Sequence, residues 1–383
     1  MSAASARRDD RLTVAVIGVG GALGSAIAQR LGESTGRAAA PAHARGSATG
    51  EHLVDDCVAI TSVIGVDTVL RPMTNVVAKT ADLWSDELAS TLAAECVDVV
   101  VHAGIEADLS IHDRVQGERA TALTANVLKA CEEAGVSRLV LVSNAMVYGA
   151  SPDNPVPLAD DGELRADGRL GVVQDLLDAE GQIARWSESA SAAVTVLRPA
   201  IVVGDAIDTA LTRHFEAPRL LVLKDSRPLW QFTHIDDLVT ALQCSIVHGI
   251  DGPVPVGCSG WLTQDEVEAI SGVRRLELPA SAVISAADRL HRVGVSPAPA
   301  AELDYIRFPW VVGTERLADH GWMPMWTNAQ VLEALMVQAR GRTTIASRRL
   351  GRPDATSLTA VSAAAAVLGA AALVRARRRR LGG

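Results

Sequence analysis

Lysine and tyrosine are scarce in this chain: three lysines stand against 33 arginines, and there are two tyrosines in 383 residues. The cysteines are Cys57, Cys96, Cys131, Cys244 and Cys258, and no two of them form a C-x-x-C pair. An odd number of thiols without that spacing supports neither a disulfide framework nor a zinc site. We therefore expect free, mostly buried thiols in a reducing compartment, and no metal.

A surplus of positive charge is also missing. The formal net charge is −9, which argues against a general nucleic-acid binder. The charge is uneven, because residues 346–383 carry +7 and the rest of the chain −16. Residues 1–11 are polar, and the apolar run after them is strand-like, so we expect no secretory signal and a cytoplasmic location. With 48% hydrophobic residues, the chain is too apolar to be disordered.

Short β-branched runs alternate with helical patterns through the first 200 residues. Strands are expected at 13–18, 62–66, 76–79, 97–102, 138–143 and 194–198, and helices at 22–31, 84–95, 120–134 and 172–189. This alternation predicts an α/β fold, a Rossmann-type doubly wound parallel sheet. After Pro199 the pattern becomes mixed, which predicts a smaller C-terminal α+β lobe.

A glycine-rich turn follows the first expected strand. It fits G-x-x-G-x-x-G through Gly18, Gly21 and Gly24. Glycines at this place permit a tight turn and let the backbone approach a pyrophosphate at the N-terminus of the next helix. The position of the loop in the alternation favours a dinucleotide site over a merely tight strand–helix turn.

An acidic residue closes the second expected strand. Asp67 is placed to bind the adenosine ribose, although it lies 43 residues beyond Gly24 because of an insertion at 32–60. A carboxylate there repels a 2′-phosphate, so NAD is expected and NADP is less favoured. Arg71 lies near enough to weaken this preference.

Seven further motifs occur in order. They are Asp82-Leu83, DVVVHAG at 98–104, NVL at 126–128 leading to GVSR at 135–138, VSNAMVYG at 142–149, LRP at 197–199, FTHIDDL at 232–238, and residues 317–324 with GWMP at their end. Over residues 12–340 the chain resembles the extended short-chain dehydrogenase/reductase family, in its epimerase/dehydratase branch that handles nucleotide sugars.

The resemblance implies a set of cofactor contacts beyond the glycine loop and Asp67. They are Asp82 and Leu83 near the adenine, His102, Ala103 and Gly104 along the fourth strand, Ser143 at the active-site strand end, and Pro199 over the nicotinamide. For His102, His234 and Asp237, ordinary core or helix-cap roles stay open beside these.

The chain departs from the family at the catalytic positions. The family places a Tyr and a Lys four residues apart on one helix, and Tyr-x-x-x-Lys occurs nowhere here. Counting back from Glu180, these two places hold Val172 and Leu176, and the usual Ser/Thr place holds Asn144. Asp175 and Asp178 on the same helix are the alternative acid/base groups, since burial can raise a carboxyl pKa.

These patterns divide the chain into parts. We expect a polar tail at 1–11, an NAD-binding domain at 12–200 with the insertion at 32–60, a substrate lobe at 201–345 whose segment 235–249 packs back on the first domain, and a basic, Ala-rich tail at 346–383. Four arginines of the lobe are either diphosphate ligands or ordinary surface charges: Arg213, Arg219, Arg227 and Arg307.

The tail contains 20 uncharged residues at 355–374, followed by an arginine cluster. The length suits a membrane span, but nine alanines make it weakly apolar, and a span would export the arginines. A full span, peripheral membrane contact through 355–380 and a solvated tail remain open alternatives.

Two functional hypotheses follow. The first is an NAD-dependent epimerase/dehydratase-like enzyme with atypical or weakened catalysis on a nucleotide sugar or similar polar substrate. The second is a catalytically inactive dinucleotide sensor or membrane-linked scaffold. A small-molecule substrate is the expected partner, a second copy of the chain is a further candidate, and nucleic acid is not expected.

Overall fold

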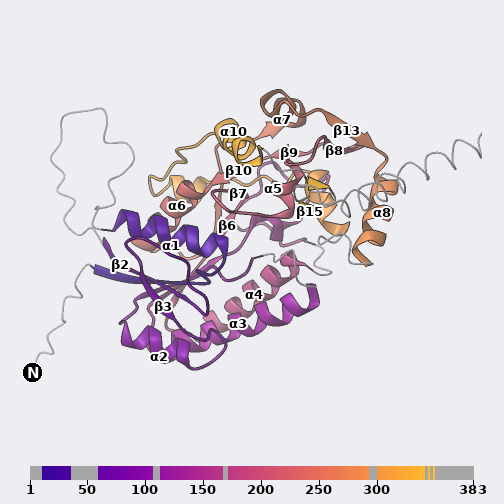
Figure 1. Cartoon of the computed structure of the whole chain (residues 1–383). Coiled ribbons are helices and arrows are strands. Elements are labelled where there is room, and N and C mark those ends of the chain that lie inside the picture. Colours follow the sequence, from indigo (N-terminus) through magenta and orange to yellow (C-terminus); the bar gives the residue numbers. More distant parts are fainter. Residues whose placement is uncertain are drawn as a thin grey trace, which may run out of the picture.

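A parallel sheet of seven strands forms the centre of the computed structural model, which describes residues 11–35, 59–106, 113–166, 171–292, 300–340, 344–345 and 348–349 (Figure 1). The order of the strands is β3-β2-β1-β4-β5-β6-β11, and every neighbouring pair is parallel. The strands are β1 (Arg11–Ile17), β2 (Ala59–Asp67), β3 (Val77–Thr80), β4 (Val99–His102), β5 (Arg138–Val142), β6 (Ala193–Pro199) and β11 (Gly252–Val256). The expected doubly wound α/β sheet is confirmed.

Helices cover both faces of the sheet because successive strand residues point to opposite sides. In β1, Val14 and Val16 pack with α1 (Ala22–Ser34) and α6 (Ile235–Val247). Ala15 and Ile17 pack in a second core with α2 (Glu87–Ala94), α3 (Asp113–Ala134) and α4 (Val172–Ser187). Segment 235–247 therefore belongs to the same hydrophobic core as the glycine-loop helix.

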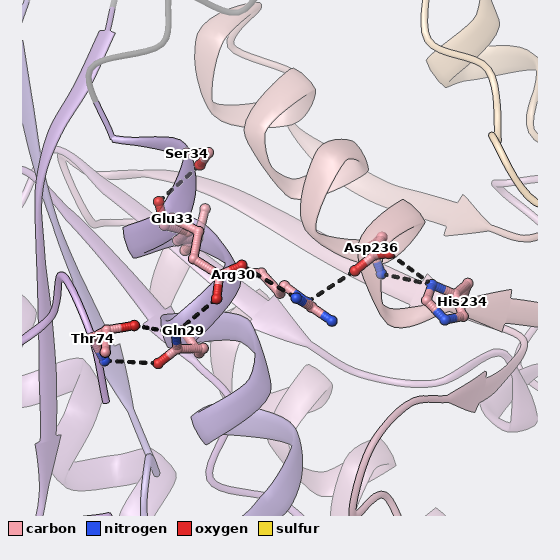
Figure 2. A network of polar contacts seen from close by, with 8 residues as sticks. Gln29, Arg30, Glu33, Ser34, Thr74, His234 and Asp236 are labelled. Carbon is pink, nitrogen blue, oxygen red and sulfur yellow. Dashed lines mark hydrogen bonds and ion pairs between the residues drawn. The ribbon is translucent and has the colours of Figure 1, made fainter. Parts of the chain in front are cut away.

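A polar network joins α1 to α6 (Figure 2). Arg30 Nε lies 2.9 Å from Asp236 Oδ1 and Arg30 Nη1 lies 3.2 Å from Glu33 Oε2. His234 begins α6 by accepting a hydrogen bond from the Asp236 N–H at 3.3 Å, and its ring stacks on Trp326. His234 thus has a helix-capping contact.

A smaller lobe lies above the carboxyl end of the sheet (Figure 1). Its elements are β7 (Ile201–Val203), α5 (Ala210–His214), β8 (Leu220–Leu223), β9 (Leu229–Trp230), β10 (Phe232–His234), β12 (Leu262–Thr263), α7 (Gln264–Ser271), β13 (Arg275–Leu278), α8 (Ala280–Arg292), the 3-10 helix η2 (Ala300–Ile306) and α10 (Asn328–Ala339). Helix α9 (Glu315–Ala318) instead packs against α6 and β11, and its Leu317 belongs to the core of the central sheet. Short strands β14 (Thr344–Ile345) and β15 (Arg348–Arg349) pair with each other. A third apolar cluster, including Phe215, Trp230 and Phe232, fills the lobe.

Two helix starts and one strand assignment differ from the sequence-based prediction. Helix α2 starts at Glu87 because residues 82–86 form a turn, with the Trp84 N–H donating to Asp82 Oδ1. Helix α3 starts seven residues before Ala120, and its Gly117 leaves room for Asp175 of α4. Strand β11 lies beyond residue 200 yet pairs with β6, so a division at 200 would separate two neighbouring strands.

The Ala-rich tail at 346–383 lies, apart from β15, outside the described residues. Most of the insertion at 32–60 does so too, although residues 32–34 complete α1. Of the helices that the structure describes, none has the length and apolar character needed to cross a membrane.

Candidate functional site

The carboxyl ends of five strands meet at one edge of the sheet. Ile17 lies opposite both Val66 and His102, and His102 in turn lies opposite Leu141. The loops after β1, β2, β4, β5 and β6 therefore open on the same edge, where parallel α/β sheets bind their ligands. Most of the predicted cofactor contacts stand at or just after these strand ends: residues 18–24, Asp67, residues 102–104, Ser143 and Pro199.

The glycine loop is tight for two separate reasons. Gly18 has φ +95°, and a Cβ there would lie 2.5 Å from Gly104 Cα. A Cβ at Gly24 would lie 2.3 Å from the Gly18 carbonyl oxygen. Backbone meets backbone at both positions, so no side chain is tolerated.

Glu106, which follows β4, was not predicted as a site residue, yet its carboxylate lies on the N-terminus of α1. Its oxygens accept hydrogen bonds from the N–H groups of Ala22 (3.1 Å), Leu23 (2.6 Å) and Gly24 (3.3 Å). Burial raises the pKa of Glu106, against the lowering effect of these hydrogen bonds. The space beside Gly21 is taken by this carboxylate, since a Cβ there would lie 2.5 Å from Glu106 Oε1.

The donor set at this loop fits an anion. Three consecutive N–H groups converge on one carboxylate, and helix α1 adds the partial positive charge of its N-terminus. A pyrophosphate is an anion of the kind that such a loop binds. One signal for Glu106 was present in the sequence: it is an acid two residues after Gly104, beyond a strand that neighbours β1.

Asp67 contacts the same loop. Its Oδ2 accepts a hydrogen bond from the Gly20 N–H at 2.8 Å, and its Oδ1 accepts one from the Thr68 N–H at 2.7 Å. Arg71 is exposed, and its Nε donates to the Gly20 carbonyl oxygen at 2.9 Å. The carboxylate and the guanidinium are thus both held beside Gly20.

The other predicted cofactor contacts differ in exposure. Asp82 is exposed, whereas Leu83 is buried and its carbonyl oxygen accepts a hydrogen bond from Asn126 Nδ2 at 2.9 Å. His102 is fully buried, with Nε2 3.2 Å from Thr124 Oγ1. Burial lowers the pKa of His102 to about 4, so its ring is neutral at neutral pH. Ala103 is also buried.

A buried ionic cluster joins the ends of β5 and β6 to α4. Arg198 Nη2 lies 2.6 Å from Glu180 Oε2, and both side chains are less than 10% exposed. Ser143 Oγ donates to Glu180 Oε1 at 2.5 Å. The guanidinium of Arg198 lies over the Tyr148 ring, whose hydroxyl donates to the Asp160 carbonyl oxygen at 2.8 Å. Ser143 and Tyr148 are therefore engaged within the protein.

The three positions that the sequence predicted as altered catalytic positions, Asn144, Val172 and Leu176, hold side chains without an acid/base group. Asn144 begins the 3-10 helix η1 (Ala145–Tyr148): its Oδ1 accepts from the Met146 N–H at 2.9 Å, and its Nδ2 donates to the Ala200 carbonyl oxygen at 3.4 Å. Leu176 is buried in the core beneath α4, and Val172 is half-buried.

The two carboxylates considered as replacements point to different surroundings. Asp175 is buried, and its Oδ2 accepts a hydrogen bond from Gln116 Nε2 of α3 at 3.1 Å. Asp178 is exposed and accepts one from Gln174 Nε2 at 2.7 Å, within its own helix.

Three buried side-chain atoms in the described part of the chain lack a hydrogen-bond partner: His214 Nε2, Ser226 Oγ and Arg307 Nε. All three belong to the smaller lobe. Burial lowers the pKa of His214 to about 4, and its ring stacks on Trp230. In contrast, Arg213 is held by Asp208, with Nε–Oδ1 and Nη2–Oδ2 distances of 2.7 and 2.8 Å.

Solved structures of similar fold include UDP-glucose 4-epimerase from Thermus thermophilus in complex with NAD (17% identity, TM-score 0.61, covering 86% of this chain and 99% of that one). UDP-glucuronic acid 4-epimerase from Bacillus cereus in complex with NAD is similar at 16% identity and TM-score 0.59, with coverage of 86% and 99%. Both likenesses concern the fold.

The amino-acid sequence is similar to a relative and matches a family model. The uncharacterized protein Rv0501 of Mycobacterium tuberculosis (strain ATCC 25618 / H37Rv) is 29% identical over 304 residues, 76% of this chain and 79% of that protein. The family model described as NAD dependent epimerase/dehydratase matches residues 14–256, from the first strand of the sheet to the last. The chain therefore belongs to the NAD-dependent epimerase/dehydratase family.

Proposed function

We propose that this protein binds a nicotinamide dinucleotide at the glycine loop and acts on a nucleotide sugar or similar polar substrate with weakened catalysis. The observation that carries the first part is the convergence of the Ala22, Leu23 and Gly24 N–H groups on a single anion position. Such a position at the first strand–helix turn of a doubly wound sheet suits a pyrophosphate. When bound, a nicotinamide dinucleotide supplies hydride transfer.

NAD is the cofactor we propose, in preference to NADP. Asp67 stands at the end of β2 with its carboxylate beside Gly20. Its charge disfavours a 2′-phosphate on the adenosine ribose, whereas its oxygens suit the ribose hydroxyls. Arg71 reduces this preference without reversing it, because its Nε is already bonded to the Gly20 carbonyl oxygen.

Weakened catalysis follows from the residues at the family's catalytic places. A tyrosine with a lowered pKa moves a proton to or from the substrate in this family, and Val172 has no proton to move. Leu176 has no charge that could lower the pKa of a neighbouring group. The side-chain amide of Asn144 is hydrogen-bonded to the backbone through both its oxygen and its nitrogen. Acid–base groups contribute about 10²–10⁴-fold to a rate, so a slow residual reaction is expected.

The smaller lobe supports a polar substrate. His214 Nε2, Ser226 Oγ and Arg307 Nε are buried without partners, and such atoms are normally satisfied in a folded protein. A ligand with hydroxyl or phosphate oxygens would supply the missing partners. The neighbours named above act on nucleotide sugars, which carry both groups.

A second candidate function is that of an inactive dinucleotide sensor or membrane-linked scaffold. The specific observation in its favour is Leu176, which is 3% exposed and packs in the core where the family holds its lysine. Val172, one turn earlier on α4, is half-buried, so neither of these two positions offers a reactive group.

Calorimetry with NAD tests the binding site. The variant Gly21→Val should lose binding, because its side chain would occupy the anion position beside Gly21. Gly181→Val is the matched control, since a Cβ there meets nothing nearer than Arg185 Nη1 at 3.5 Å. Equal NAD affinity in wild type and Gly21→Val would remove the loop from the proposal.

Turnover separates the two candidates. With UDP-glucose and NAD, the wild type should turn over well below about 1 s⁻¹, the low end of ordinary enzymes. The combined variant Asn144→Ser, Val172→Tyr, Leu176→Lys should increase the rate if the rest of the site is intact. A wild-type rate above about 1 s⁻¹ would contradict weakened catalysis and direct attention to Asp175 and Asp178.

Membrane linkage through residues 355–380 is tested by fractionating cells that express the full chain or a chain stopped at Asp354. Each arginine near an anionic surface contributes about 1 kcal/mol, so the full chain should be partly membrane-bound. Peripheral binding should be released by high salt, whereas a span would need detergent. If both chains stay wholly soluble at low salt, there is no membrane linkage.

A further inference from the structure

Every backbone N–H from Gly20 to Gly24 already has an acceptor within this chain. Gly20 donates to Asp67, Gly21 donates to the Gly18 carbonyl oxygen, and the remaining three donate to Glu106. The anion position at the N-terminus of α1 is thus filled by a side chain.

The fit of Glu106 to this position is specific. Its two oxygens share three donors, and the shortest of these bonds is the one from the Leu23 N–H, at 2.6 Å. The absence of a side chain at Gly21 provides the space, since a Cβ there would collide with Glu106. The positive charge of Arg71 also attracts the carboxylate.

A second anion cannot share the position with Glu106. A pyrophosphate that used the N–H groups of Ala22, Leu23 and Gly24 would place its oxygens where the carboxylate oxygens are. Two like charges at hydrogen-bond distance from the same donors repel each other strongly. Binding of either anion therefore excludes the other.

We propose that Glu106 is an internal competitor of the dinucleotide, so that cofactor binding is an exchange in which the pyrophosphate displaces the Glu106 carboxylate from α1. This inference rests on the proposed binding function and adds a determinant of affinity to it. A protein whose binding-competent form is a fraction of the total binds more weakly by that fraction. If the carboxylate fills the position in nine of ten molecules, the apparent affinity falls about tenfold.

Two variants separate charge from shape. Glu106→Gln keeps the length of the side chain and an acceptor oxygen but removes the charge, and Glu106→Ala vacates the position. Glu132→Gln, an exposed acid on α3, is the matched control. In calorimetry with NAD, Glu106→Ala should bind about tenfold more tightly than wild type, Glu106→Gln should also bind more tightly, and Glu132→Gln should equal wild type.

Inorganic pyrophosphate tests the exchange without the dinucleotide. Added to the apo proteins, it should raise the thermal midpoint of Glu106→Ala more than that of wild type, because only the variant offers free donors. The double variant Gly21→Val/Glu106→Ala should lose this response, since the valine fills the vacated space. If the double variant is no longer stabilised by pyrophosphate, the anion binds at the glycine loop.

The two measurements distinguish failure of the inference about Glu106 from failure of the proposed dinucleotide-binding function. If wild type and both Glu106 variants bind NAD equally and respond equally to pyrophosphate, Glu106 is no competitor and the inference is wrong, while the binding function stands. If no variant binds NAD but pyrophosphate stabilises Glu106→Ala alone, the internal anion is supported at α1 and the proposed dinucleotide function is wrong.

Discussion

The buried pair of Arg198 and Glu180 offers a sharp test of how the site is held together. The pair joins β6 to α4, and Ser143 Oγ donates to the same carboxylate. The substitution Glu180→Gln preserves the volume but leaves the guanidinium buried without a counter-charge. Hydrogen bonding and the charge of Glu180 keep the pKa of Arg198 raised despite burial, so the arginine will not release its proton.

The expected loss of stability is about 3–5 kcal/mol, the usual cost of removing one partner from a buried ion pair. Glutamine can still accept one hydrogen bond, so a value near the lower limit is expected. The exposed pair of Arg165 and Glu163, with side chains 49% and 73% exposed, provides the control. Glu163→Gln should change stability by less than about 1 kcal/mol.

Urea unfolding followed by circular dichroism measures both effects. Glu180→Gln should lower the midpoint with an unchanged slope. The double variant Glu180→Leu/Arg198→Met should lose less stability than Glu180→Gln, because it strands no charge. Two results would refute the reasoning that an unpaired Arg198 charge accounts for most of the lost stability. One is a loss below about 1 kcal/mol for Glu180→Gln, and the other is a larger loss for the double variant than for Glu180→Gln.

Three further changes have definite outcomes. Gly24→Ala should lower stability by about 1–3 kcal/mol, because its Cβ would lie 2.3 Å from the Gly18 carbonyl oxygen; an unchanged thermal midpoint would contradict this. His214, whose pKa is lowered to about 4, is protonated more readily when unfolded, so stability should fall as the pH drops from 6.5 to 4. His214→Phe keeps a ring against Trp230 and should reduce that pH dependence, leaving the part due to His102, whose pKa is also lowered to about 4. A pH dependence of stability equal to that of wild type would exclude His214 as a source. Arg30→Met removes partly exposed ion pairs, so urea unfolding should detect less than about 1 kcal/mol, and a loss above about 2 kcal/mol would give the α1–α6 network a larger role.

The layered fold was predictable because it depends on periodic apolar residues. In β1, alternate residues pack into the two cores on opposite faces of the sheet. A strand buried on both faces is a short run of apolar, mostly β-branched residues, and such a run can be recognised in the sequence. The place of β11 was not predictable, because its sequence, Gly252–Val256, contains two prolines and pairs only with β6 at the edge.

The site was predictable at the level of backbone and less so at the level of side chains. Gly18 and Gly24 could be identified because close backbone contacts admit no other residue. The only sequence signal for Glu106 is an acid two residues after Gly104, and an acid after a strand could point to solvent as readily as to a helix. Asn144 Nδ2 donates to the carbonyl oxygen of Ala200, 56 residues away, and a local pattern carries no information about a contact over that distance.

The pairing of β6 with β11 has a consequence for synthesis of the chain. Strand β6 ends at Pro199 and its partner ends at Val256, so 57 residues must emerge between them. At about 5–20 residues per second, the nascent sheet presents an unpaired edge for about 3–11 seconds. Such an edge is a template for pairing with other chains, and protection during this interval, by a chaperone or by slow folding of the sheet, would favour recovery of the native protein.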